Sequence, residues 1–281
     1  MKRIVVGNDL SARSDLALSR AARLAHQFTA KLEVITVLDE LFFEATTAQK
    51  QQAAEDAVAR QVKQLPTVAE LDITTHVAIG SDFNEIIQHA DQSDAELSGL
   101  GPHRHKHPEL FRGTTAERVI RYGTRPVLVA KHAGDGPYKR VLVPTDLSAH
   151  AAQAARVAAQ LAPGGEIVLL HAVQRPFTGL LSEETQAAAI AHDRSRAVSV
   201  LDALANELRG DLGDRAPEFV INVAEGTVLE TIDQQIAAYK PDLIAMGTHG
   251  RTGIAHALIG SVAADVLSRS HVDGLVCTHS G

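Results

Sequence analysis

The 281-residue chain has one cysteine and no tryptophan, and only 4% of its residues are aromatic. The single cysteine, Cys277, excludes an internal disulfide framework and is typical of proteins in a reducing compartment. Hydrophobic residues still make up 45% of the chain, so alanine, valine, isoleucine and leucine must fill the interior. This composition is typical of helices layered on a sheet.

Long apolar runs are also missing. No stretch approaches the ~18 apolar residues that a membrane-spanning helix needs, and the opening MKRIVVGNDL is too short an apolar run for a signal peptide. The net charge of −7 disfavours binding to the phosphate backbone of nucleic acids. We therefore expect a soluble cytoplasmic protein that binds neither a membrane nor nucleic acid.

The chain contains two copies of one pattern. Lys2–Ser11 (KRIVVGNDLS) returns as Lys139–Ser148 (KRVLVPTDLS), and each copy is an apolar run that ends in an Asp-Leu-Ser turn suited to capping a helix. We predict two domains, residues 1–132 and 138–281, each about as large as an ordinary small domain. A polar, glycine-rich linker is expected at residues 131–137.

Strands and helices alternate within each half. Continuous apolar runs predict strands that are covered on both faces of a parallel sheet, and apolar residues at i, i+3 and i+4 predict the helices between them. In the second half, strands are expected near residues 139–144, 165–172, 217–223, 242–246 and 273–278, and helices near 148–161, 183–208, 227–238 and 261–270. Five strands with four crossovers predict an α/β fold with two doubly wound parallel-sheet domains in tandem.

A glycine pattern follows the fourth strand of the second half. It reads Gly247-x2-Gly250-x9-Gly260-Ser261, and its last two residues open a helix. Glycines let the backbone approach a phosphate, and a helix N-terminus offers unpaired N–H groups and a favourable dipole. Ligands of such sheets bind beyond the carboxyl ends of the strands, so Asp146 would lie beside this loop. The pattern predicts a nucleotide site where Asp146 accepts a hydrogen bond from ribose or adenine.

The matching loop of the first half departs from this pattern. Arg104 stands where the second glycine belongs, and the span to Gly113 is one residue shorter. A side chain there places a Cβ where a phosphate would press against the backbone, so we expect no triphosphate site in this half. His103, His105 and His107 alternate in the loop, and two of them can reach a common Zn²⁺ from an extended segment. A solvated polar loop is the alternative interpretation.

The repeat, the glycine pattern and the aspartate after the first strand together resemble the universal stress protein family. The resemblance covers nearly the whole chain, with one family domain in each half. It implies the strand order 3-2-1-4-5 in each half and a site between strands one and four. ATP-binding members of the family share the G-x2-G-x9-G-S/T pattern and this aspartate, so the resemblance implies ATP, with or without Mg²⁺, as the ligand of the second half.

The resemblance also implies a role for each matching residue of the second half. Ribose and the phosphates would be held by Gly247, Gly250, Gly260, Ser261 and Val262. The adenine and ribose end would be lined by Pro144, Thr145, Asp146 and the backbone of Ala172. The same stretch adds Met246 at the end of the strand, His249 inside the loop and Arg251 as the cation nearest the phosphates.

The implied function is that of an ATP-binding regulatory protein of the stress response. Three alternatives stay open: a slow ATPase, a flavin- or adenylate-handling enzyme, and a nucleotide- or zinc-binding protein with a divergent first domain. Hydrolysis needs an activated water and stabilisation of the transferring phosphoryl group, and the motif offers no convincing base. The chain has no Walker A sequence, which argues against a P-loop NTPase.

The last strand of each half is apolar and would be left exposed in a separate domain. We therefore expect the halves to pack face to face as an internal pseudo-dimer, with Val127–Val129 and Leu275–Cys277 meeting antiparallel. A homodimer of the whole chain stays open.

Overall fold

The computed structural model describes residues 1–39, 47–66, 68–102, 113–134, 136–174, 182–248 and 259–278. The first half contains strands β1 (Arg3–Gly7), β2 (Lys31–Leu38), β3 (Ile73–Ile79), β4 (Leu97–Leu100) and β5 (Val127–Val129), and helices α1 (Ala12–Phe28), α2 (Thr47–Lys63), α3 (Asp82–Gln92) and α4 (Thr115–Tyr122). The second half contains β6 (Arg140–Pro144), β7 (Glu166–Val173), β8 (Glu218–Glu225), β9 (Leu243–Gly247) and β10 (Asp273–Cys277), and helices α5 (Ala149–Leu161), α6 (Glu183–Leu212), α7 (Val228–Tyr239) and α8 (Ser261–Arg269). Within these ranges, no helix is long and apolar enough to cross a membrane.

All ten strands form one sheet, in the order β3-β2-β1-β4-β5-β10-β9-β6-β7-β8. Each half therefore has the order 3-2-1-4-5, and neighbouring strands within a half run parallel. This confirms the predicted doubly wound fold. The halves join where β5 and β10 pair antiparallel, with Leu128 opposite Leu275. The predicted edge pairing is confirmed, but packing face to face is wrong because the halves meet edge to edge.

The repeated Asp-Leu-Ser turn starts the first helix of each half. Leu10 and Leu147 have φ angles of 60° and 67°, in the left-handed region. The following serines, Ser11 and Ser148, cap α1 and α5 by accepting a hydrogen bond from a backbone N–H of the first helical turn. The backbone N–H of Ser148 in turn donates to Asp146 Oδ1 at 3.1 Å. The turn thus sets both the helix start and the orientation of the aspartate.

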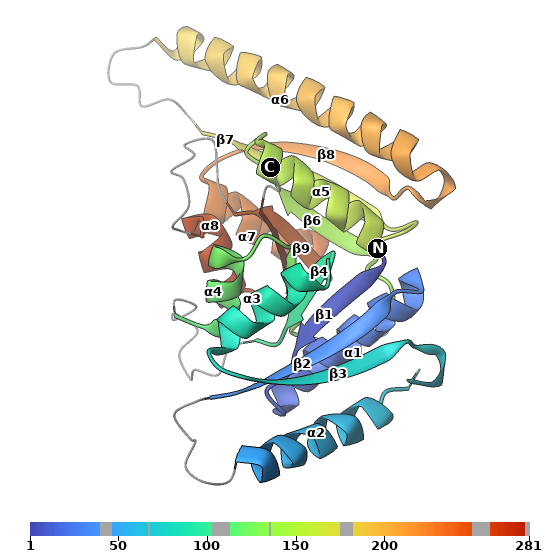
Figure 1. Cartoon of the computed structure of the whole chain (residues 1–281). Helices are drawn as coiled ribbons and strands as arrows, with labels where there is room; N and C mark the ends of the chain where they lie inside the picture. The colour runs from blue at the N-terminus through green and yellow to red at the C-terminus, as the bar shows by residue number, and fades with distance from the viewer. Residues whose placement is uncertain are drawn as a thin grey trace.

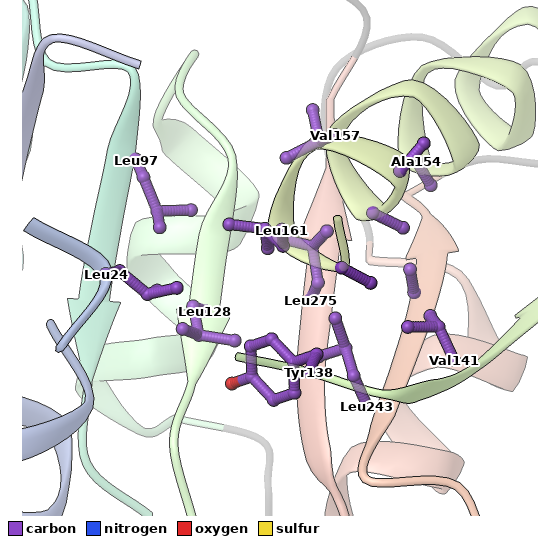
Figure 2. Packing of buried hydrophobic residues seen from close by; sticks show 14 of the residues in the cluster. Leu24, Leu97, Leu128, Tyr138, Val141, Ala154, Val157, Leu161, Leu243 and Leu275 are labelled. Carbon is purple, nitrogen blue, oxygen red and sulfur yellow. The ribbon is translucent and has the colours of Figure 1, made fainter. Parts of the chain in front are cut away.

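Each face of the sheet carries one hydrophobic core that extends through both halves. One core is covered by α1, α2, α5 and α6, and the other by α3, α4, α7 and α8 (Figure 1). Figure 2 shows the first core at the seam, where Leu97 and Leu128 of the first half lie near Leu161 and Leu275 of the second. All four side chains are buried. The hydrophobic effect therefore stabilises the two halves as one layered unit.

A buried carboxylate lies at the seam. Asp273, the first residue of β10, is fully buried, and its Oδ2 forms an ion pair with Arg20 Nε of α1 at 3.2 Å. The Tyr138 hydroxyl donates to the same oxygen at 2.8 Å. Its Oδ1 accepts hydrogen bonds from the backbone N–H groups of Lys131 and His132, at 2.7 and 3.0 Å. Both halves and the segment between them therefore meet at one carboxylate.

The predicted linker is organised around Arg20. The guanidinium lies over the ring of Tyr138, with 4.3 Å from Cζ to the ring centroid, and Nη1 donates to the Gly136 carbonyl at 3.0 Å. Gly134 has a φ of +67°, and any Cβ there would overlap the guanidinium. Glycine is thus needed at this position for both its conformation and its lack of a side chain.

We predict that Asp273→Ala lowers the free energy of unfolding by about 3–5 kcal/mol, because it leaves the Arg20 guanidinium buried without a counter-charge. Denaturant unfolding followed by circular dichroism measures the change. Asp265→Ala is the matched control, since it removes an exposed i,i+4 pair with Arg269 and should change stability little. Equal effects of the two substitutions would contradict the role of Asp273.

Candidate functional site

The site residues of the second half that the structure describes lie near the carboxyl ends of β6, β7 and β9 and at the start of α8. Pairing between β6 and β9 is confined to Val141 with Leu243 and Leu142 with Ile244, although β6 continues to Pro144 and β9 to Gly247. The two strands therefore separate toward their carboxyl ends. The helices that follow them, α5 and α8, pack on opposite faces of the sheet. This is the switch point of a doubly wound sheet, where ligands bind.

Asp146 leaves β6 at this point. Its Oδ1 accepts the Ser148 N–H, while its Oδ2 is buried and has no hydrogen-bond partner among the residues that the structure describes. A buried carboxylate oxygen without a donor costs free energy. Asp146 is therefore suited to accept a hydrogen bond from a ligand that enters the gap between β6 and β9.

The neighbouring Thr145 forms hydrogen bonds within the protein through its backbone N–H, its backbone carbonyl and its Oγ1. Its N–H donates to the Leu170 carbonyl at 2.8 Å, its Oγ1 accepts the Leu147 N–H at 3.0 Å, and its carbonyl is 2.7 Å from His171 Nδ1. Thr145 and His171 therefore hold the turn that presents Asp146. The adjacent Pro144 is half-buried and ends β6.

β7 continues past the end of β6. The last pair between them is Pro144 with Leu170, but β7 runs on to Val173. Residues two apart on a strand direct their backbone groups to the same neighbour. The N–H and C=O of Ala172 therefore point to the side where β6 has ended, which agrees with the adenine contact implied by the family resemblance.

Two glycines of the motif are required by packing. A Cβ on Gly247 would lie 2.7 Å from His150 Cβ and 2.9 Å from Ala151 N, at the start of α5. A Cβ on Gly260 would lie 2.8 Å from the carbonyl oxygen of Thr248, to which the Gly260 N–H also donates, at 2.7 Å. This bond closes the base of the glycine loop. Met246, just before Gly247, is buried.

The N-terminus of α8 lies at the same end of the sheet as the carboxyl end of β9, because α8 is the helix that follows β9. Its N-cap is Gly260, which has no side chain to accept the N–H groups of the first turn. Ser261 is exposed and Val262 is half-buried. Because the first N–H groups of a helix lack intrahelical partners and carry a partial positive charge, this end of α8 is suited to an anion such as a phosphate.

The corresponding helix of the first half, α4, is closed by its own side chains. The Thr114 hydroxyl accepts the Glu117 N–H at 2.9 Å, and Glu117 Oε2 accepts the Gly113 N–H at 2.8 Å. Glu117 is buried, so its carboxylate lies where the corresponding anion of the second half would bind. The Thr-x-x-Glu spacing is a recognised capping signature and was visible in the sequence, where Ala264 replaces this glutamate in the second half.

The turn after β1 is also filled. Asn8, the counterpart of Thr145, is buried and donates from Nδ2 to Gln61 Oε1 of α2 at 2.8 Å. Gln61 Nε2 donates in turn to Asp15 Oδ1 at 2.8 Å. These bonds tie α2 to the start of α1. The turn after β1 is therefore held by side-chain hydrogen bonds to α1 and α2.

Some predicted site residues lie outside the described part of the chain. These are His249, Gly250 and Arg251 of the glycine loop, and His103, His105 and His107 of the proposed zinc site. Among the residues that are described, no group of three or more His, Cys, Asp or Glu side chains is placed to hold a metal ion. The zinc site stays a prediction.

Fold and site together define a tandem pair of doubly wound α/β domains, of which the second has strands β6 and β9 that stop pairing before their carboxyl ends. Residues 1–131 and 137–278 each match the Universal stress protein family. The chain therefore belongs to this family, and the resemblance drawn from the sequence is confirmed.

Individual relatives agree with this assignment. The chain is 30% identical over 149 residues to a universal stress protein of Methanocaldococcus jannaschii, a match covering 51% of this chain and 84% of that protein. The crystal structure of a universal stress protein from Archaeoglobus fulgidus superposes with a TM-score of 0.70 at 19% identity, covering 98% of both chains. A putative universal stress protein from Pseudomonas aeruginosa gives 0.68 at 20% identity, covering 99% of this chain and 93% of that one. These two structures share the fold of the whole tandem chain.

We predict that Gly247→Ala destabilises the protein by about 1–3 kcal/mol without any ligand present, because the new Cβ overlaps the start of α5. Gly101→Ala should have a similar effect, since a Cβ there would lie 2.7 Å from the Arg13 carbonyl oxygen at the start of α1. Thermal unfolding tests both variants. Gly136→Ala is the control, because a Cβ at Gly136 meets nothing within 4 Å. A Gly101→Ala variant as stable as the wild type would contradict the packing role assigned to this pair of glycines.

Proposed function

We propose that the second half binds one adenine nucleotide, ATP, in the crevice between β6 and β9. The observation that carries this proposal is the buried Oδ2 of Asp146 at the switch point, which has no hydrogen-bond partner in the described part of the chain. A ribose hydroxyl or the adenine amino group would supply the missing donor. The open N-terminus of α8 supports placing the phosphates at Gly260, Ser261 and Val262.

The two ends of the proposed site fit the two ends of a nucleotide. Asp146 and the backbone of Ala172 offer hydrogen-bonding groups for the polar edges of ribose and adenine. The helix N-terminus offers N–H groups for charged oxygens. His249, Gly250 and Arg251 would complete the phosphate end, and Mg²⁺ would accompany the phosphates. We infer one nucleotide per chain, because Glu117 places a negative charge where the phosphates of a second nucleotide would bind in the first half.

We propose that the protein is a cytoplasmic regulator of the stress response. Nucleotide occupancy would decide its conformation or its partners. Slow ATP hydrolysis is the competing function. Hydrolysis needs a base to activate water, and the carboxylate of Asp146 is assigned here to the ribose and adenine end, away from the γ-phosphate. Measuring phosphate release with and without Mg²⁺ separates the two functions, and we expect no multiple turnover in either condition.

Calorimetric titration of the wild-type protein should give one ATP per chain. Ala264→Glu places a carboxylate at the N-terminus of α8, as Glu117 does on α4, and should repel the phosphates. Loss of two charge-assisted hydrogen bonds corresponds to an affinity about a hundredfold weaker or more. Ala188→Glu, at an exposed position of α6, is the matched control and should bind normally. A stoichiometry of two, or normal binding by Ala264→Glu, would show that the site is wrongly assigned.

Asp146→Asn should weaken ATP binding by about tenfold, because the amide keeps the Oδ1 acceptor for Ser148 but presents donors in place of Oδ2. Binding of inorganic triphosphate should not change, since Asp146 is assigned to the nucleoside end. Asp9→Asn in the first half is the control and should leave ATP affinity unaltered. Equal losses for ATP and triphosphate would instead indicate that Asp146 acts on the phosphates or on the fold.

A further inference from the structure

The C-terminal end of α8 is capped by a lysine from the first half. Lys131, two residues after β5, donates from Nζ to the carbonyl oxygen of Leu267 at 2.8 Å and also to that of Ser270. The last carbonyls of a helix have no intrahelical donor and carry a partial negative charge. An ammonium group that donates to two carbonyls at this end therefore holds the helix by both hydrogen bonds and charge.

α8 is short, so its two ends are closely linked. It contains nine residues, which span about 13 Å. Its N-terminus begins at Ser261, where the proposed nucleotide site needs N–H groups in fixed positions. A shift or fraying of the C-terminal turn moves much of such a short helix. The group that holds the C-terminal end therefore also decides where the N-terminal N–H groups point.

Lys131 is itself held by the seam. Its backbone N–H donates to Asp273 Oδ1, so the residue is fixed between β5 of one half and β10 of the other. The reverse contact across the seam is weaker, because Thr278, after β10, donates from a neutral hydroxyl to the carbonyl of Thr124, after α4, at 2.8 Å. The cationic contact thus goes to the helix of the open site, and the closed site receives a hydroxyl.

We propose that Lys131 is a positioning residue for nucleotide binding, through which the first half orders the phosphate-binding helix of the second. This inference rests on the proposed function. It gives the first half a role in the site although its own glycine loop lacks the family pattern. The second half alone would contain every predicted contact residue but would lack the group that holds α8.

Lys131 carries its charge at neutral pH. Burial lowers the pKa of Lys131 to about 8, although the nearby Asp273 carboxylate favours the charged form. The other titratable or charged groups of this seam cluster are Arg20, Tyr138, His132 and His271. Burial and the Asp273 carboxylate raise the pKa of Tyr138. At pH 7 the two carbonyls at the end of α8 therefore face an ammonium group.

The ionisation of Lys131 also affects stability. The pKa of Lys131 is about 8 in the folded protein and 10.5 for the ordinary side chain, so the unfolded chain binds more protons between these values. The contribution of Lys131 to stability therefore rises with pH from 8 toward 10.5. Because the folded position favours the neutral amine above pH 8, the role of the ammonium group is tested at pH 7.

The test measures ATP affinity of the full chain at pH 7, where Lys131 is charged. Lys131→Met should bind ATP about five- to thirtyfold more weakly than wild type. Lys131→Arg keeps the charge and the donors, so it should restore most of the affinity. Lys139→Met, at an exposed position after the linker, is the matched control and should behave like wild type.

The outcomes separate the two proposals. A wild-type protein that binds no ATP overturns the proposed function and this inference with it. A wild type that binds ATP together with a Lys131→Met variant of equal affinity overturns the inference alone. If Lys131→Met does not fold, Lys131→Gln decides the matter, because it keeps a donor but lacks the charge, and an affinity equal to that of wild type would overturn the inference.

Discussion

The buried ion pair between Asp273 and Arg20 is the constraint on which the arrangement of the halves depends. A carboxylate without exposed surface must have its charge and its lone pairs satisfied. At Asp273 the partners come from α1, from the residues after β5 and from Tyr138, two residues before β6. Apolar contacts between β5 and β10 would tolerate other registers, whereas these directional partners fit one. The pair thereby specifies how two similar sheets join.

The two halves have the same fold but use it differently. In the first, Glu117 and Thr114 close the N-terminus of α4, and Asn8 is bonded to Gln61. Each of these polar groups is satisfied internally, which favours stability over ligand binding. In the second half, within the ranges that the structure describes, Asp146 has an oxygen without a donor and α8 begins without a capping side chain. The second half thus retains unsatisfied groups of the kind that a ligand completes.

Much of this was predictable from the sequence because it is local or repeated. The Asp-Leu-Ser turns and the apolar strands follow from short patterns that occur twice, whereas the strand order was implied by the family resemblance. The pairing of the two last strands was also predicted. The ion pair at the seam was not predictable, since Arg20 resembles an exposed helix residue and its partner Asp273 is distant in the sequence. The glycines were only partly understood. Gly247 is needed where β9 packs against α5, which a phosphate-centred interpretation of the motif does not reveal.

Because β5 and β10 pair within one chain, formation of the sheet does not depend on how abundant the protein is. Two separate domains would associate only at sufficient concentration, and they would lose translational and rotational freedom each time. Within one chain the second strand is present at an effective concentration on the order of millimolar. The ten-stranded sheet therefore forms equally well whether a cell contains many copies of the protein or very few. A change in expression therefore changes how many chains a cell contains, while each chain still forms its whole sheet.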